Sequence, residues 1–218
     1  HEGHLFLVKQ SKLLCSKTIV SIYINPAQFS PKEDLDSYPK TLEDDLAHLE
    51  KLNVDAVFLP SDKEMYPHNK INFIYKNNLF NKLEGKSRPH FFYGVTKVVS
   101  KLFNIVNPTH TFFGEKDAQQ SRVIKKMICD LKLTIDFVSC PTIRDNNGLA
   151  LSSRNNYLSF QEQVNASLLY KSLMLVRDAI LRGEKKTKTL KVLFEDTIYT
   201  SDDIKIDYIS VACNDTLK

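Results

Sequence analysis

The sequence predicts an α/β protein with a Rossmann-like parallel sheet, followed by a smaller α+β domain. Short runs of β-branched and apolar residues alternate with longer segments whose apolar residues recur every three or four positions. Alternation of this kind is typical of parallel strands joined by right-handed helical crossovers. Near residue 141 the chain becomes polar and rich in turn-forming residues, which indicates a boundary. We therefore expect domains at residues 1–142 and 143–218.

Four segments of the first domain have the composition of short buried strands. They are TIVSIYIN (18–25), VDAVFLP (54–60), THTFFG (109–114) and TIDFV (134–138). Between them, apolar stripes with helical spacing predict helices at 41–53, 94–106 and 122–133. These elements together predict one parallel sheet of four strands with helices on its faces.

The second domain is predicted to be mainly helical. Ser159 and Glu162 have the spacing of a capping box at the start of a long helix, and a second helix follows at 190–198. The alternating segment IKIDYISVA (204–212) predicts a strand. The last residues, CNDTLK, have the character of a connection, so we expect this domain to be incomplete here.

The composition is that of an ordinary globular protein. Of 218 residues, 42% are hydrophobic, and the net charge of +4 comes without a dense stripe of Lys and Arg, so we expect no nucleic-acid partner. We see no long apolar run and expect no membrane partner. The four cysteines are scattered without zinc-site spacing, which favours reduced thiols in a cytoplasmic protein.

The chain opens on HEGH, which places His1 and His4 one helical turn apart. At the N-terminus of a helix, two imidazoles beside free N–H groups can bind phosphate and stabilise charge on phosphorus. Taken alone, however, the motif favours a structural role or a remnant of a purification tag. A metal pair is less favoured because no third ligand is visible.

Two polar segments follow predicted strands, where parallel sheets place their ligands. In NPAQF, the amides of Asn25 and Gln28 can bind a polar substrate, although Asn-Pro can equally form a simple turn. In FFGEKDAQQ, Gly114 allows close approach of a ligand, Lys116 suits phosphate, and Asp117 can bond a ribose hydroxyl. Gln119 or Gln120 would face the same site, and the alternative is a polar turn with Asp117 as helix cap.

Two further sets of residues can contribute to a phosphate site. Ser152, Ser153 and Arg154 offer two hydroxyls and a guanidinium, a combination suited to pyrophosphate, although Ser-Ser-Arg is common in loops. Asp44 and Asp45 could hold Mg²⁺ near phosphates, but an exposed helix face is the favoured interpretation.

The segments HEGH, NPAQF, EDLDSYPKTLEDDL, MYP, FFGEKDAQQ and LSSRNNYLS, in this order, closely resemble the pantothenate synthetase (pantoate–β-alanine ligase) family. The likeness runs essentially from end to end. That family belongs to the HxGH nucleotidyltransferase-like superfamily. The resemblance implies ATP-dependent condensation of pantoate with β-alanine to pantothenate, through pantoyl adenylate, with release of AMP and pyrophosphate. It also implies coenzyme A biosynthesis, Mg²⁺ accompanying ATP, and a homodimer.

The resemblance also implies roles for individual residues. The catalytic set would be His1, His4, Lys116, Ser152, Ser153 and Arg154. ATP would be bound by these residues together with Gly114, Glu115, Asp117, Ile143 and Leu151. Pantoate and β-alanine would be bound by Asn25, Gln28, Arg88 and Gln120. The metal position would fall at Asp44 and Asp45.

The chain departs from the family pattern in several places. Leu151 stands where a Met is usual, and Ala118 replaces a common aromatic residue. In RPHFFYGV, Phe91 occupies the usual position of a histidine and His90 lies one residue earlier. The family also has a strand and a PTMGAL-like turn before HxGH. We therefore expect residues 1–218 to be part of a longer protein.

Two other functions compete with the ligase. Another adenylyl- or cytidylyltransferase of the HxGH group would act on a phosphorylated substrate and would not need Gln28 and Gln120 as a pair. A degenerate nucleotide-binding scaffold would have no activity. The intact set of His, Lys, Asp, Ser and Arg side chains argues against the scaffold.

Overall fold

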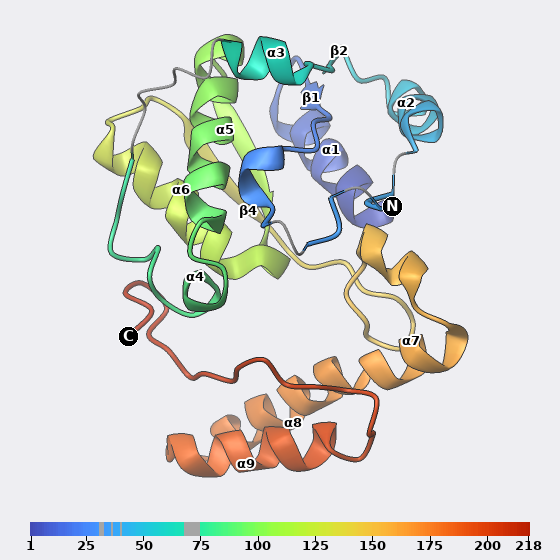
Figure 1. The fold of residues 1–218 in the computed structure, drawn as a ribbon, viewed down its shortest axis with the longest axis vertical. Coiled ribbons are helices and arrows are strands. Elements are labelled where there is room, and N and C mark those ends of the chain that lie inside the picture. Colours follow the sequence, from blue (N-terminus) through green and yellow to red (C-terminus); the bar gives the residue numbers. More distant parts are fainter. Residues whose placement is uncertain (31–32, 36, 40, 68–74) are drawn as a thin grey trace. The chain divides into compact units, whose positions relative to one another are not determined.

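A computed structural model describes residues 1–30, 33–35, 37–39, 41–67 and 75–218 (Figure 1). The chain divides into two compact units. The N-terminal unit comprises Glu2–Pro141 with Leu217, and the C-terminal unit comprises Thr142–Thr216 with His1 and Lys218. Each unit is described by itself below. The functions that the sequence suggests for the two domains remain predictions.

The N-terminal unit contains two parallel pairs of strands. β1 (Ile19–Ser21) pairs with β2 (Ala56–Phe58), and α2 (Leu42–Lys51) lies between them in the sequence. β3 (His110–Gly114) pairs with β4 (Asp136–Cys140), and α6 (Ala118–Asp130) connects them. The predicted strands are therefore present and parallel. The first two are shorter than the sequence suggests.

Among the described residues these strands form two separate pairs, whereas the sequence predicts one sheet of four strands. The physical reason is that apolar periodicity reports burial and direction but not adjacency. A crossover helix requires its two strands to be parallel, and it permits other elements to lie between them. The connection from β2 to β3, which includes α3 (Asp62–Met65), α4 (Glu84–Ser87) and α5 (Phe91–Val106), joins strands that share no ladder.

Helices α5 and α6 lie side by side and supply most of the core of this unit (Figure 1). Both carry an apolar stripe on one face, as their sequences predict. On α6, Val123, Ile124 and Met127 are completely buried, and Phe80 and Phe92 are 2% exposed beside them. Burial of each such side chain contributes about 1.5–3 kcal/mol. This core anchors the segments at the carboxyl ends of β1 and β3.

Helix α1 (Glu2–Leu14) begins at the HEGH motif, which is the condition under which the sequence places His1 and His4 one turn apart. Glu2 lies in its first turn and Lys12 in its last, which complements the helix dipole. The helix packs against β3. Its N-terminal turn can therefore contribute to the same region as the residues that follow β3.

The C-terminal unit is helical, with η4 (Ser153–Tyr157), α7 (Phe160–Ala166), α8 (Leu168–Leu181) and α9 (Thr187–Ile198). The predicted capping box is present, because Ser159 N donates to Glu162 Oε2 and Glu162 N donates to Ser159 Oγ. The single long helix expected after it is divided into α7 and α8. Helices α8 and α9 pack together around Leu190, Phe194 and Ile198.

The strand predicted at 204–212 is not formed. Its alternation suits a strand, but a strand is stable only beside a partner, and this segment has none among the described residues. The only strand-like pairing described in this unit is the antiparallel bridge between Arg144 and Ala150. The expected α+β character is thus reduced to helices and one short hairpin.

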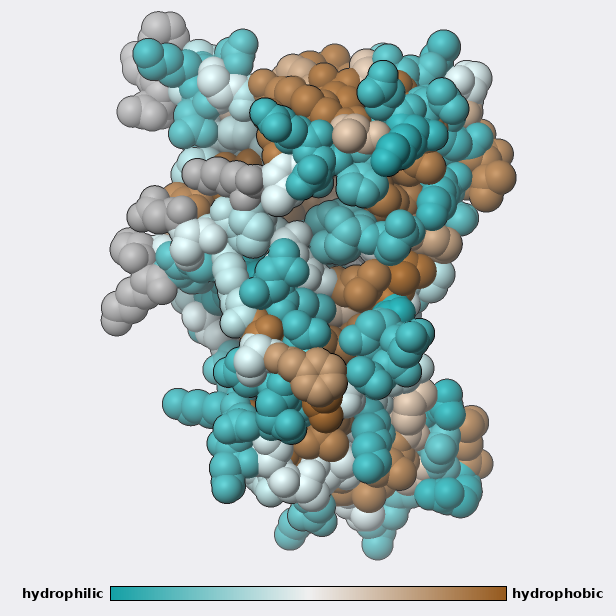
Figure 2. Space-filling view, turned by 90° about the vertical axis from the view of Figure 1, so that its right-hand side faces the viewer, coloured by the Kyte–Doolittle hydropathy of each residue, from teal (hydrophilic) through white to brown (hydrophobic). Residues whose placement is uncertain are grey.

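On the face shown in Figure 2, hydrophilic residues alternate with areas of hydrophobic ones. Leu13 and Leu181, for example, are each 77% exposed. Within the described part of the chain, none of the helices has both the length and the apolar character needed to cross a membrane.

Candidate functional site

The N-terminal turn of α1 brings a histidine near the residues that follow β3. His1 directly precedes the helix and is exposed, and His4 lies one turn further along. His4 retains a solvent-exposed face, yet the protein surrounding its ring lowers its pKa below 6.5 by desolvation. The positive charge of Lys116 lowers this pKa further. His4 is therefore a neutral imidazole at pH 7, within electrostatic range of a lysine from another element.

The residues after β3 present polar groups to solvent. Gly114 ends the strand, and apart from its two chain neighbours no described residue has an atom within 4 Å of the place where a Cβ would stand. In η3 (Glu115–Asp117), Lys116 Nζ lies 3.9 Å from Asp117 Oδ1, and their side chains are 42% and 62% exposed. Glu115 accepts a hydrogen bond from Ser139 on β4. The open space at Gly114 fits close approach of a ligand to the backbone.

Asp117 precedes α6, but its carboxylate makes no cap hydrogen bond. Asp117 therefore occupies the N-cap position after a polar strand-to-helix turn, as the alternative expects, but without a side-chain cap hydrogen bond. The Asp117 side chain is 62% exposed beside Lys116, and its carboxylate can also accept a hydrogen bond from a hydroxyl of a bound ligand.

The two glutamines after Asp117 differ in their surroundings. Gln119 is buried, its Nε2 donates to the carbonyls of Leu79 and Lys82 at 2.9 and 2.7 Å, and its Oε1 accepts from Glu84 N. These hydrogen bonds of Gln119 connect α6 to the segment that leads into α4. Gln120 is half-buried, and no hydrogen bond to another described residue occupies its amide. Of the two, Gln120 is the one available to a ligand.

Asn25 is 2% exposed and all its hydrogen-bonding capacity is used inside the protein. Its Nδ2 donates to Gly94 O at 3.1 Å and to Gln28 Oε1 at 3.2 Å. Its Oδ1 accepts from Ala27 N at 3.2 Å and from the Tyr66 hydroxyl at 2.7 Å. The sequence predicts Asn25 as a substrate ligand, whereas the structure makes it a support for Gln28.

These contacts determine which group Gln28 offers to a ligand. The backbone partners require the nitrogen of Asn25 to face Gly94 and its oxygen to face Ala27. Gln28, in η1 (Pro26–Gln28), must therefore turn its oxygen toward Asn25. Its Nε2 remains to donate to an oxygen of a substrate.

Sequence reasoning missed two residues that hold this arrangement. A Cβ on Gly94 would lie 2.2 Å from Ala27 O, so only glycine lets α5 approach η1 this closely. Burial and the charge of Asp62 raise the pKa of Tyr66 to about 12, which keeps its hydroxyl protonated as a donor to Asn25. Tyr66 belongs to the MYP segment, which was a usable signal. Gly94 gave none that separates it from an ordinary helical glycine.

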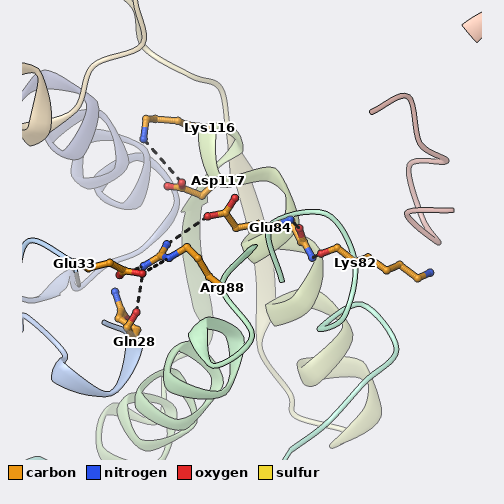
Figure 3. Close-up of polar contacts among 8 residues, drawn as sticks. Gln28, Glu33, Lys82, Glu84, Arg88, Lys116 and Asp117 are labelled. Atoms are coloured by element: carbon orange, nitrogen blue, oxygen red, sulfur yellow. Dashed lines mark hydrogen bonds and ion pairs between the residues drawn. The ribbon is translucent and has the colours of Figure 1, made fainter. Parts of the chain in front are cut away.

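Arg88 lies between α4 and α5 and is surrounded by partners (Figure 3). Its Nε and Nη2 donate to Glu33 Oε1 and Oε2 at 2.9 and 2.5 Å. Nη2 also donates to Gln28 O at 3.2 Å, and Nη1 lies 3.5 Å from Glu84 Oε1. The hydrogen bond from Arg88 lowers the pKa of Glu33 below its ordinary value of 4.5. Glu33 begins the EDLDSYPKTLEDDL segment, but the sequence did not indicate its contact with Arg88.

The departure at Phe91 has a structural counterpart. The Arg88 guanidinium lies 4.0 Å from the centroid of the Phe91 ring, within the range of a cation–π contact. His90 directly precedes α5 and its side chain does not cap it. The position at which the family usually has histidine is thus occupied by an aromatic ring that supports Arg88.

Asp44 and Asp45 lie in the first turn of α2. Asp44 is exposed, and Asp45 accepts a hydrogen bond of 3.4 Å from Thr41. Consecutive residues of a helix point about 100° apart, so the two carboxylates do not converge on one ion. The described residues contain no group of three or more His, Cys, Asp or Glu that could hold a metal. These two residues therefore do not fit a resident Mg²⁺ site.

The remaining predicted residues belong to the C-terminal unit. Leu151 N donates to Ile143 O at 2.9 Å, which closes a hairpin over the intervening turn. Ser152 caps η4 by accepting from Arg154 N at 3.3 Å. The hairpin thereby places the hydroxyls of Ser152 and Ser153 beside the exposed Arg154. Their participation in the same site as His4 and Lys116 remains a prediction.

Comparison with known proteins identifies close relatives. A family model described as pantoate–β-alanine ligase matches residues 1–218. Pantothenate synthetases of Acetivibrio thermocellus and Caldicellulosiruptor saccharolyticus are 47% and 49% identical over 218 residues, covering all of this chain and 78% of each relative.

Solved structures agree with these relatives. Pantothenate synthetase from Thermus thermophilus has a TM-score of 0.96 and 36% identity, covering 100% of this chain and 79% of that one. A pantoate–β-alanine ligase from Francisella tularensis, complexed with β-γ ATP and β-alanine, has a TM-score of 0.76 and 38% identity, covering 90% and 74%. The α/β fold with parallel strands is thus that of pantothenate synthetases. The chain belongs to the pantoate–β-alanine ligase family.

Proposed function

We propose that the N-terminal turn of α1, η1 and η3 bind ATP and pantoate for a two-step ligation. As a member of its family, the protein is a ligase that condenses pantoate with β-alanine at the expense of ATP. The observations that carry the assignment to this site are the packing of α1 against β3, the influence of the Lys116 charge on His4, and the open space at Gly114.

In the first step, an oxygen of the pantoate carboxylate attacks the α-phosphorus of ATP. This forms pantoyl adenylate and releases pyrophosphate. In the second step, the amine of β-alanine attacks the acyl carbon, which forms the amide of pantothenate and releases AMP. The protein has to hold an anionic carboxylate against a polyanion, so positioning and charge neutralisation supply most of the catalysis.

ATP would be bound mainly through its phosphates. His1, His4 and Lys116 would donate to phosphate oxygens, and Asp117 would accept from a ribose hydroxyl. The backbone from Gly114 to Glu115 would lie along the nucleotide. The remaining ATP-binding residues would come from the C-terminal unit: Ile143, Leu151, Ser152, Ser153 and Arg154. Their hydroxyls and guanidinium are suited to pyrophosphate, and the Francisella ligase was solved with β-γ ATP and β-alanine.

Pantoate would be bound by the amides of Gln28 and Gln120. Gln28 has its Nε2 available because its Oε1 accepts a hydrogen bond from Asn25. The side-chain amide of Gln120 makes no hydrogen bond with the described residues. Two amides that donate and accept are suited to a substrate that has hydroxyls and a carboxylate. β-Alanine would bind next to Gln28.

Mg²⁺ would enter with ATP as part of the substrate and neutralise phosphate charge. No step is assigned to Asp44 or Asp45, whose carboxylates do not converge. The homodimer and the cytoplasmic location are proposed by analogy with the family. The four cysteines are free in the structure, which supports a reducing compartment.

Release of pyrophosphate and AMP tests the proposal. With ATP and pantoate alone, we expect about one pyrophosphate to be released per enzyme active site, because the adenylate stays bound. Addition of β-alanine should start continuous formation of AMP and pantothenate. If AMP forms without pantoate and β-alanine, or only with a phosphorylated acceptor, the protein is another nucleotidyltransferase instead.

A further inference from the structure

Two charged side chains outside the predicted catalytic set, Arg88 and Glu33, form a cluster with the backbone of Gln28. Arg88 binds both carboxylate oxygens of Glu33 and also the backbone carbonyl of Gln28 (Figure 3). Gln28 and Glu33 come from the chain after β1, whereas Arg88 comes from the junction of α4 and α5. The guanidinium therefore joins the α4–α5 junction to Glu33 and Gln28, which lie 55 and 60 residues earlier in the sequence.

This guanidinium is poorly placed to bind the carboxylate of a substrate. Its Nη1 lies 3.5 Å from Glu84, one face covers the Phe91 ring, and the side chain is 27% exposed. Arginine binds carboxylates most strongly through two parallel hydrogen bonds, and Glu33 already makes both. A second carboxylate would have to displace Glu33.

The same contacts restrict Gln28 from its backbone side. The bidentate pair of hydrogen bonds with Glu33 fixes the plane of the guanidinium. In this orientation Nη2 also donates to Gln28 O. From the other side, Asn25 fixes the orientation of the Gln28 amide. Gln28 is thus held at its carbonyl by Arg88 and at its side chain by Asn25.

We propose that Arg88 and Glu33 form a positioning pair that holds Gln28 against pantoate, and that Arg88 does not itself bind the substrate carboxylate. This inference rests on the proposed pantoate site at Gln28. It differs from direct recognition by Arg88, because the two roles predict opposite effects when Glu33 is neutralised.

The first test is steady-state kinetics of Glu33→Gln. If the pair positions Gln28, loss of the charge-assisted bonds should raise the KM for pantoate about tenfold. The kcat and the KM for ATP should change less than about twofold. If Arg88 instead binds pantoate directly, the substitution releases its guanidinium, and an unchanged or lower KM for pantoate overturns the proposal.

A double-mutant cycle tests whether the two residues act as one unit. Arg88→Lys keeps the charge but loses the two-pronged geometry, so it should also raise the KM for pantoate. The double variant should be no worse than the worse single variant. Additive effects of the two substitutions contradict a shared role. Lys126→Gln removes an ion pair with Asp130 on α6 that involves neither Gln28 nor its partners, and it should leave the KM for pantoate unchanged.

A measurement without turnover separates this inference from the proposed function. The side-chain amide signals of Gln28 in the ligand-free protein, followed by nuclear magnetic resonance, should shift or broaden in Glu33→Gln and stay in place in Lys126→Gln. Unchanged Gln28 signals in Glu33→Gln overturn the positioning pair, whatever the activity. If pantoate fails to perturb these signals in the wild-type protein, the assignment of pantoate to Gln28 is wrong instead.

Discussion

At the scale of single residues, the site depends on a lysine and a histidine that influence each other. Lys116 is exposed enough to reach a ligand, and its charge lowers the pKa of the already desolvated His4. A neutral His4 can donate one N–H to phosphate without adding to the repulsion that Lys116 would otherwise experience. The two residues thereby place one full charge and one polar donor beside Gly114.

Lys116→Ala should cost about 2.7–4 kcal/mol of transition-state stabilisation, the range for removal of a donor at developing charge. This corresponds to a fall of about 10²–10³ in kcat for adenylate formation, measured by pyrophosphate release. Lys126→Ala, on the exposed face of α6, serves as the control and should retain full activity. Unchanged turnover in Lys116→Ala would remove this lysine from the mechanism.

The interaction of His4 with Lys116 also predicts a titration. In the folded protein the pKa of His4 should lie below 6.5, because desolvation, then the positive charge of the chain's amino terminus, and then that of Lys116 disfavour its protonated form. Removal of a positive neighbour favours protonation, so Lys116→Ala should raise the midpoint, with Lys126→Ala as the control. Histidine resonances followed against pH measure both values. A midpoint that is the same with and without Lys116 contradicts the contact.

At the scale of elements, the position of η1 depends on how closely α5 approaches it. Gly94→Ala places a Cβ 2.2 Å from a backbone oxygen that cannot rotate away. We expect a loss of about 1–3 kcal/mol in the free energy of unfolding and a higher KM for pantoate, since Gln28 moves with η1. Chemical denaturation and steady-state kinetics check the two effects.

Gly114→Ala is the matched substitution. Among the described residues beyond its chain neighbours, none has an atom within 4 Å of the added Cβ, so stability should change by less than about 0.5 kcal/mol. The KM for ATP should nevertheless rise, because the methyl group occupies space that we assign to the nucleotide. Equal losses of stability in the two variants would contradict the difference in packing between the crowded Gly94 and the open Gly114. An unchanged KM for ATP would exclude close approach at Gly114.

The contact between the η1 region and the α4–α5 junction should weaken in acid. The folded-state pKa of Glu33 is lowered by Arg88, so its contribution to stability is fully present above the ordinary value of 4.5 and is lost as pH falls through the lower folded value. The difference in unfolding free energy between the wild type and Glu33→Gln should be constant at neutral pH and shrink below about pH 4.5. An equal difference at pH 7 and pH 3 contradicts the role of this charge.

The sequence predicts local elements well because their signals are local. The apolar stripes of α5 and α6, the start of α1 and the capping box at Ser159 all follow from neighbouring residues. Strand pairing and the pairing of Glu33 with Arg88 join residues far apart, so periodicity carries no information about them. Asn25 illustrates the limit within a motif: its position suggested a ligand, but only the structure shows that four internal contacts use its amide.

At the scale of the whole molecule, residues of both units are proposed to serve one reaction. The N-terminal unit holds His4, Lys116 and Gln28, and the C-terminal unit holds the hairpin that ends at Ser152–Arg154. The order of the chemical steps is proposed from the chemistry of the reaction, because the carboxylate has to be activated as an adenylate before the amine can displace AMP. The central claim is therefore that the pantoate carboxylate attacks the α-phosphorus before β-alanine reacts.

Oxygen transfer tests this claim most directly. Pantoate labelled with ¹⁸O in its carboxylate is allowed to react with ATP and β-alanine, and the products are analysed by mass spectrometry. The adenylate pathway predicts one labelled oxygen in each AMP, because the bridging oxygen leaves with the nucleotide, and none in pyrophosphate. AMP without the label would contradict the account.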